Sequence, residues 1–123
     1  MATFLEGHEK ISWVRFPSLP SDGDYALAQK YMPNGTCGVI SFGVKGGREA
    51  AERFMAKLTI AAIETHVADA RTCCLHPASA THRQMNDEEL IAAGVPGDLV
   101  RLSVGLENWQ DLAEDIEQAL ATI

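Results

Sequence analysis

The clearest strand signal in the chain is the stretch LVRLSVG at residues 99–105. Val100, Leu102 and Val104 occupy every second position, so in an extended strand they point to one face. Arg101 lies between them and points to the opposite face. The stretch therefore predicts a half-buried strand from Leu99 to Gly105 with an arginine on its less apolar side.

Working outward, hydrophobic periodicity and turn residues predict four strands and four helices that alternate along the chain. The strands are expected at Ile11–Phe16, Gly38–Val44, Thr72–Leu75 and Leu99–Gly105, and the helices at Asp24–Tyr31, Arg48–Leu58, Asp87–Ala93 and after Asn108. Residues 60–66 are ambiguous by period. This order predicts an α/β or α+β layer, with helices packed on one small sheet. A chain of 123 residues suffices for one domain, so residues 1–123 are expected to form a single unit.

Local patterns predict the core side chains of one strand and two helices, and the two ends of a further helix. In the strand before Gly46, alternate apolar residues define the buried face: Ile40, Phe42 and Val44. Two helices carry apolar stripes at spacings of three and four residues: Ala50, Ala51, Phe54 and Leu58 in one, and Trp109, Leu112, Ile116, Leu120 and Ile123 in the other. The short helix at residues 87–93 has a capping-box pattern, with Asn86 as its N-cap, Glu89 three residues on, and Gly94 as its stop.

Composition excludes several classes of protein. Hydrophobic residues make up 46% and charged residues 22%, which is typical of a globular domain. Seventeen acids and ten bases give a net charge of −7, the wrong sign for binding nucleic acid or an anionic membrane. No apolar run approaches the roughly 18 residues of a membrane span, and Met1–Lys10 has no signal-peptide core. The three cysteines, Cys37, Cys73 and Cys74, are expected to be buried thiols, which predicts a cytoplasmic protein.

Arg101 is the strongest candidate for a binding residue. A guanidinium cannot lose its charge when it is buried, so an arginine among apolar strand residues requires an anionic partner. Its planar fork suits a carboxylate, which it can bind through two parallel hydrogen bonds. The alternative is a purely structural ion pair with an acid of the chain, such as Glu107 or Asp69.

The segment HPASATH at residues 76–82 places imidazoles and hydroxyls at the end of a strand, where they could line a pocket. The simpler interpretation is an ordinary loop with a satisfied histidine. A zinc site from His76, His82 and a cysteine lacks the usual ligand spacing. Ser79 and Ser103 lack the context of a nucleophile elbow, so a serine hydrolase has little support. Gly46-Gly47 before a helix is only a weak phosphate-binding signal.

Several of these segments together resemble the Cys/Met metabolism enzymes that use pyridoxal phosphate. The matching segments cover most of the chain: Phe4–Leu19, Ser41–Gly47, His76–His82, Asp87–Gly94 and Leu99–Glu107. Gly43 and the opening segment are most similar to the O-acetylhomoserine sulfhydrylase branch, since the cystathionine synthases and lyases tend to carry an acid at that glycine. The resemblance implies the small C-terminal domain of a fold-type I enzyme, with a mostly antiparallel sheet.

The resemblance also assigns roles to three residues. The arginine that matches Arg101 binds the α-carboxylate of the amino-acid substrate, and the threonine that matches Thr81 helps to orient that arginine. The position that matches His66 lies beside the substrate, where relatives usually have serine or asparagine. Histidine at this position is therefore a departure from the family pattern, and we expect it to affect substrate preference.

For the whole enzyme, the resemblance implies a transferase of methionine biosynthesis that replaces acetate by sulfide or a thiol, and a homotetramer. The pyridoxal phosphate would be bound by a large N-terminal domain that is absent from these 123 residues, so the chain is expected to be an excised part that is inactive alone. Two alternatives remain open at this stage. One is a parent of the cystathionine γ-synthase or methionine γ-lyase type, and the other is a free-standing module that binds a small carboxylate through Arg101.

Overall fold

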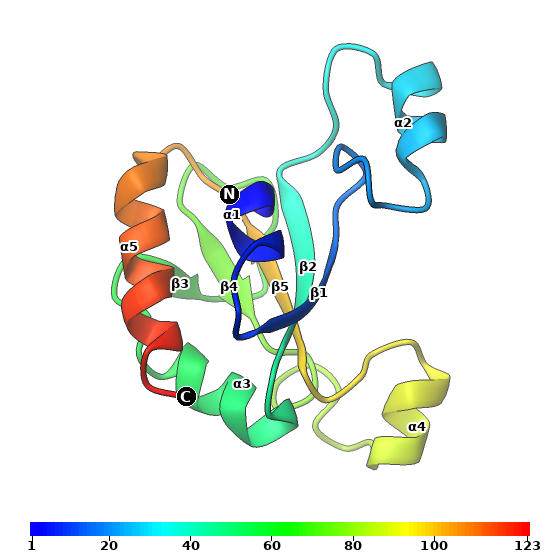
Figure 1. Ribbon diagram of the computed structural model, residues 1–123. Coiled ribbons are helices and arrows are strands. Elements are labelled where there is room, and N and C mark those ends of the chain that lie inside the picture. Colours follow the sequence, from blue (N-terminus) through cyan, green and yellow to red (C-terminus); the bar gives the residue numbers. More distant parts are fainter.

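A computed structural model describes residues 1–123, and its centre is a five-stranded sheet in the order β1-β2-β5-β4-β3 (Figure 1). The strands are β1 (Ile11–Arg15), β2 (Val39–Val44), β3 (Ala62–Ile63), β4 (Cys73–Leu75) and β5 (Leu99–Ser103). Every neighbouring pair is antiparallel except β3 and β4. The expected small, mostly antiparallel sheet is therefore confirmed, with β3 added in the segment whose periodicity was ambiguous.

Five helices accompany the sheet: α1 (Ala2–Glu6), α2 (Tyr25–Tyr31), α3 (Gly47–Met55), α4 (Asp87–Ala92) and α5 (Trp109–Leu120). Residues of α1, α3 and α5 join the hydrophobic core, so these three helices pack on one face of the sheet. By contrast, α2 and α4 stand away from the sheet at two corners of the molecule (Figure 1). The short helix α1 was not predicted, because five residues are too few to show a helical period. None of the helices has the length and apolar character that a membrane span requires.

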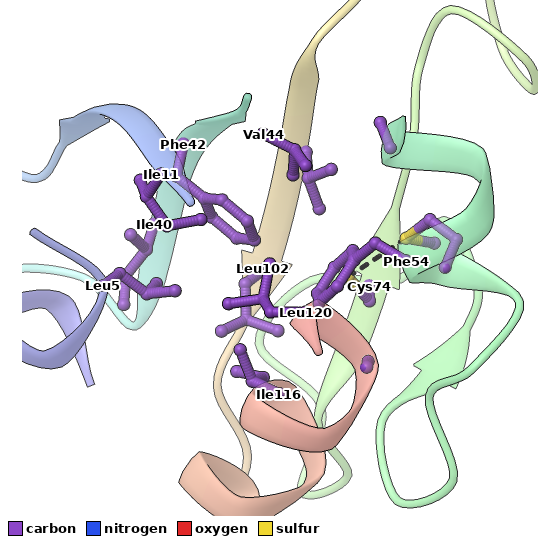
Figure 2. Close-up of a cluster of buried hydrophobic side chains, with 14 of the residues drawn as sticks. Leu5, Ile11, Ile40, Phe42, Val44, Phe54, Cys74, Leu102, Ile116 and Leu120 are labelled. Atoms are coloured by element: carbon purple, nitrogen blue, oxygen red, sulfur yellow. Dashed lines mark hydrogen bonds between the residues drawn. The ribbon is translucent and has the colours of Figure 1, made fainter. Parts of the chain in front are cut away.

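The register of β2 and β5 confirms the predicted faces. Ile40 pairs with Leu102 and Phe42 with Val100, and all four side chains are buried. Phe54 of α3 meets Phe42 edge to face, with 6.0 Å between the ring centroids, a favourable aromatic geometry. Figure 2 shows Phe42 and Phe54 on either side of Leu102, with Ile116 and Leu120 of α5 next to them.

Two predicted core positions are wrong. Trp109 is 57% exposed, because it is the first residue of α5 and lies before the turns that pack on the sheet. Cys37 is also exposed, in the loop that leads into β2. The other two cysteines are buried as expected, and burial raises the pKa of the Cys74 thiol to about 12. The Cys74 Sγ lies 3.4 Å from the Met55 Sδ in the core (Figure 2).

The predicted capping box of α4 is present in full. The Asn86 side chain accepts a hydrogen bond from the Glu89 amide at 3.0 Å, and the Glu89 side chain accepts one from the Asn86 amide at 2.9 Å. Gly94 follows the helix with a φ of +72°, a left-handed conformation that glycine adopts without strain. The sequence therefore specifies both ends of this helix locally.

Asp115 of α5 is a buried carboxylate that fixes the chain between α3 and β3. It accepts hydrogen bonds from the amides of Thr59, Ile60 and Ala61 at 2.8–3.1 Å, and from the Thr59 hydroxyl at 2.7 Å. Burial alone would raise its pKa, but these donors stabilise the charged form and lower the pKa of Asp115 below its ordinary value of 3.8. The carboxylate therefore stabilises the fold in its ionised form.

We predict that Asp115 makes stability depend on pH on the acidic side. Its pKa is lower in the folded state than in the unfolded state, so its contribution is complete above the unfolded-state pKa and is lost as the pH falls through the folded-state pKa. Asp115→Asn should lower the free energy of unfolding by about 2 kcal/mol at neutral pH and flatten this acid limb. Urea unfolding between pH 2 and pH 7 measures both effects. The exposed neighbour Glu114→Gln is the control, and equal pH profiles for wild type and Asp115→Asn would contradict the assignment.

Candidate functional site

Arg101 lies in the middle of β5, on the face of the sheet opposite the helices α1, α3 and α5. The register aligns it with Ser41 of β2 on one side and Leu75 of β4 on the other. Arg15 of β1 pairs with Ser41, so one row of residues crosses four strands. The row carries two arginines, but Arg15 is exposed and has ion-pair partners in Asp22 and Asp24.

The guanidinium of Arg101 has no acidic partner in the chain. Its Nη2 donates to the Thr65 carbonyl at 2.7 Å and makes a longer contact of 3.5 Å with the His66 carbonyl. Its Nε is buried and has no hydrogen-bond partner. Backbone carbonyls carry only partial charges, so Arg101 keeps an unpaired full charge and a free donor, as an anion-binding residue would.

The alternative of a structural ion pair for Arg101 is wrong, because both candidate acids are engaged elsewhere. Glu107 accepts from the Thr72 amide at 2.8 Å and from its hydroxyl at 2.7 Å. Burial opposes ionisation of Glu107, but the Thr72 donors lower its pKa below the ordinary value. Asp69 accepts from the Arg71 amide at 3.1 Å. These contacts shape the loop next to β5 without neutralising Arg101.

The segment from Glu64 to Ala68 passes over β5 and brings His66 to Arg101. Besides the Arg101 contacts, the Ala68 amide donates to the Ser103 hydroxyl at 3.0 Å. Ala68 has a φ of +57°, a strained conformation for a residue with a Cβ. The His66 side chain is 66% exposed, and its Nδ1 lies 2.9 Å from a Glu64 carboxylate oxygen. The structure therefore places His66 beside Arg101 through its backbone, with its imidazole facing solvent.

Thr81 is not joined to Arg101 by a hydrogen bond. Its hydroxyl shares a hydrogen bond of 2.9 Å with His82 Nδ1, and Thr81 is exposed. The two candidate residues brought together by this structure are thus Arg101 and His66.

A second polar cluster on the same sheet face surrounds Gly43, which pairs with Leu99 of β5. The Asp98 carboxylate accepts from the Trp13 indole at 2.9 Å and from the Ser12 hydroxyl at 3.0 Å, at the position where a side chain of residue 43 would stand. Sequence reasoning missed Asp98, and only the glycine in a strand hinted at such a close approach. Asp98 thus places a carboxylate over this face from the loop before β5.

Of the remaining sequence candidates, the HPASATH segment lines a cavity of about 430 Å³ with His76, Ser79 and Ala80. No group of three or more histidine, cysteine or acidic side chains is arranged to hold a metal ion, and His76 and His82 do not form such a group with a cysteine. Gly46 and Gly47 line a cavity of about 510 Å³ together with Arg48, whose guanidinium is paired with Asp87 at 2.9 Å.

Comparison with known proteins gives a consistent assignment. The sequence model of the Cys/Met metabolism PLP-dependent enzyme family matches residues 1–121. The chain is 44% identical over 124 residues to an O-acetyl-L-homoserine sulfhydrylase of Leptospira meyeri, covering 100% of this chain and 28% of the relative. It is 43% identical over 120 residues to a homocysteine synthase of Schizosaccharomyces pombe, covering 98% of this chain and 28% of the relative. These matches confirm the family resemblance expected from the sequence.

A solved structure agrees with these relatives. A chain assigned as an O-acetylhomoserine (thiol)-lyase from Campylobacter jejuni, crystallised with N'-pyridoxyl-lysine-5'-monophosphate, superimposes with a TM-score of 0.88 at 38% identity. The match covers 98% of this chain and 28% of that chain. The present chain therefore spans somewhat more than a quarter of the length of the proteins it matches.

We predict that Gly43→Ala destabilises the polar cluster over the sheet. A Cβ at this position would collide with Trp13 Nε1, Asp98 Oδ2 and Ser12 Oγ, so the cluster must move. We expect a loss of about 1–3 kcal/mol in the free energy of unfolding. A shift of Trp13 fluorescence, measured in a Trp109→Phe background that leaves one tryptophan, should accompany the loss. Gly23→Ala is the control, because a Cβ there meets nothing within 4 Å; an unchanged Trp13 spectrum in Gly43→Ala would refute the packing argument.

Proposed function

Because the chain belongs to the Cys/Met metabolism family of PLP-dependent enzymes, we propose that residues 1–123 are the C-terminal, substrate-carboxylate-binding domain of an O-acetylhomoserine sulfhydrylase. The whole enzyme would replace the acetate of O-acetylhomoserine by sulfide or a thiol, as a transferase of methionine biosynthesis. Relatives named as sulfhydrylase and homocysteine synthase, at 44% and 43% identity, support this branch.

The single observation that carries the proposal is the unsatisfied guanidinium of Arg101. A charged group with a buried, unpaired Nε and no acidic partner costs stability unless a ligand completes it. An amino-acid carboxylate would supply two acceptor oxygens to the planar fork. Held in this way, the α-carboxylate would fix the orientation of the α-C–H bond, and positioning of this kind can lower a reaction barrier by several kcal/mol.

The residues of this chain do not form a site for pyridoxal phosphate itself. The Lys10 ammonium donates to the Leu120 and Ile123 carbonyls at 3.0 and 2.7 Å, and the Lys30 ammonium lies 5.0 Å above the Tyr31 ring. The other two lysines, Lys45 and Lys57, are exposed, and Arg101 does not line the cavity to which Lys45 belongs. When bound, the cofactor supplies an electron sink for carbanions. We therefore assign its binding to a large domain outside these 123 residues, and propose that the chain alone is inactive.

Roles for His66 and Thr81 complete the proposal. His66 would lie beside the bound carboxylate, since its carbonyl already contacts Arg101. The role of Thr81 rests on the family resemblance alone, because its hydroxyl is hydrogen-bonded to His82 in this structure.

The proposal also includes a cytoplasmic location, supported by three free cysteines, and a homotetrameric parent, supported by the family resemblance. The net charge of −7 argues against nucleic-acid and anionic membrane partners.

The main prediction concerns Arg101 in an active enzyme. Replacing the C-terminal segment of the Leptospira meyeri relative by this chain gives a full-length chimera whose KM for O-acetylhomoserine can be measured. Arg101→Ala should raise that KM by about 10- to 100-fold, since it removes hydrogen bonds to a charged group. Arg101→Lys should raise it less steeply, because lysine keeps the charge but loses the planar fork. Arg83→Ala, an exposed arginine, is the control. An unchanged KM in Arg101→Ala would reject the assignment.

A second prediction separates an enzyme domain from a free-standing binding module. Isothermal titration of the isolated chain with O-acetylhomoserine should show no binding at millimolar concentration, because the opposite wall of the pocket is missing. An antibody raised to the chain should detect a native protein of roughly three domains' length in the source organism. Tight binding by the isolated chain, with a native band at 13.3 kDa, would instead favour the module. Formation of cystathionine with cysteine as the thiol, or cleavage of methionine, by the chimera would favour the other two branches.

A further inference from the structure

His76, the first residue of the HPASATH segment, makes two short hydrogen bonds that have no part in the proposed role of Arg101. His76 follows β4 directly and is only 2% exposed. Its Nε2 lies 2.8 Å from the Gly97 carbonyl oxygen, and its Nδ1 lies 2.8 Å from the Ser79 hydroxyl. Three groups are therefore aligned in the order carbonyl, imidazole, hydroxyl.

The Gly97 carbonyl determines which nitrogen of His76 carries the proton. A carbonyl oxygen can only accept a hydrogen bond, so the Nε2 must donate to it. In the neutral imidazole the Nδ1 then has a free lone pair, and the Ser79 hydroxyl donates to it. A second acceptor, the His76 carbonyl, lies farther from the Ser79 hydroxyl at 3.4 Å. This is the arrangement of a nucleophile, a general base and an orienting group.

The surroundings of Ser79 leave room for a small reactant. Ser79 is exposed and lies at a cavity of about 430 Å³ whose walls are mainly apolar, with Met55, Ile63, Leu75 and Ala80 among them. The only acidic side chain of the cavity, Glu52, would disfavour anionic reactants. The cavity thus suits a neutral, short acyl group.

Two backbone donors of the same segment are also free. The amide groups of Ser79 and Thr81 donate to no acceptor within the chain, although their neighbours Ala80 and His82 both donate to the Pro77 carbonyl. Free amides beside a nucleophile can stabilise the oxyanion that forms when an acyl carbonyl is attacked.

We propose that Ser79 is an activated hydroxyl that accepts an acyl group from a neutral short-chain ester. The Ser79 Oγ attacks the ester carbonyl carbon, its proton passes to the His76 Nδ1, and the alkoxide or phenolate of the ester leaves. An Oγ–acyl bond forms, the bond to the leaving group breaks, and no oxidant or further reactant is required. The inference is independent of the carboxylate role of Arg101.

The test uses p-nitrophenyl acetate and the full chain without any cofactor. We expect release of one equivalent of p-nitrophenolate and a mass increase of one acetyl group, located at Ser79 by peptide mapping. The rate should exceed that of Ser79→Ala by about 100-fold or more, the usual contribution of a positioned base. Ser79 is exposed, so its replacement by alanine should not unfold the chain.

Two controls keep the result specific. Ser18→Ala removes a hydroxyl that is hydrogen-bonded to the Thr36 hydroxyl at 2.7 Å and to no imidazole. This variant should therefore react like wild type. His76→Asn should lose the fast acylation while circular dichroism confirms that it is folded. If His76→Asn is not folded, the difference in acylation rate between Ser79→Ala and Ser18→Ala still tests the proposal. Equal rates for wild type and Ser79→Ala, or acetylation confined to lysines, would overturn the proposal.

Discussion

The antiparallel pairing of β2 with β5 is the constraint on which both the core and the candidate site depend. Because side chains alternate between faces, the register that buries Phe42 and Val100 in the core must place Arg101 on the opposite face. A slip by one residue would put the guanidinium among apolar groups without a partner, which would cost several kcal/mol. Packing of the core therefore also fixes the position of the candidate anion-binding group.

The same register leaves Arg101 incompletely satisfied. The Thr65 and His66 carbonyls hold one end of the guanidinium, while the buried Nε has no partner. Leaving such a donor unpaired costs about 1–3 kcal/mol, and the nearby Ala68 adds backbone strain. A fold selected only for stability would have paired this arginine with Glu107 or replaced it. Unfavourable features concentrated around one residue are typical of a binding site that its ligand completes.

The sequence predicted those features that depend on neighbouring residues. Period-two alternation located the buried faces of β2 and β5, and the Asn86–Glu89 pattern located the start of α4. It did not predict contacts between distant segments, such as Arg101 with Thr65, 36 residues away, or Trp13 with Asp98, 85 residues away. Such contacts depend on strand order and loop paths, which no local pattern encodes. The errors at Trp109 and Cys37 have the same origin, since burial at the end of an element depends on what packs there.

The two chemical features of this chain differ in what they need from the rest of an enzyme. The Ser79–His76 contact spans three residues and ends on Gly97, so every group that it requires belongs to this chain. Under the proposed function, Arg101 would supply one wall of a pocket shared with the rest of the enzyme, and no lysine of the chain is placed to hold the cofactor of the family near it. Reactivity of the hydroxyl should therefore survive in isolation, whereas carboxylate binding should require the missing wall. Independent tests of the two features are possible for this reason.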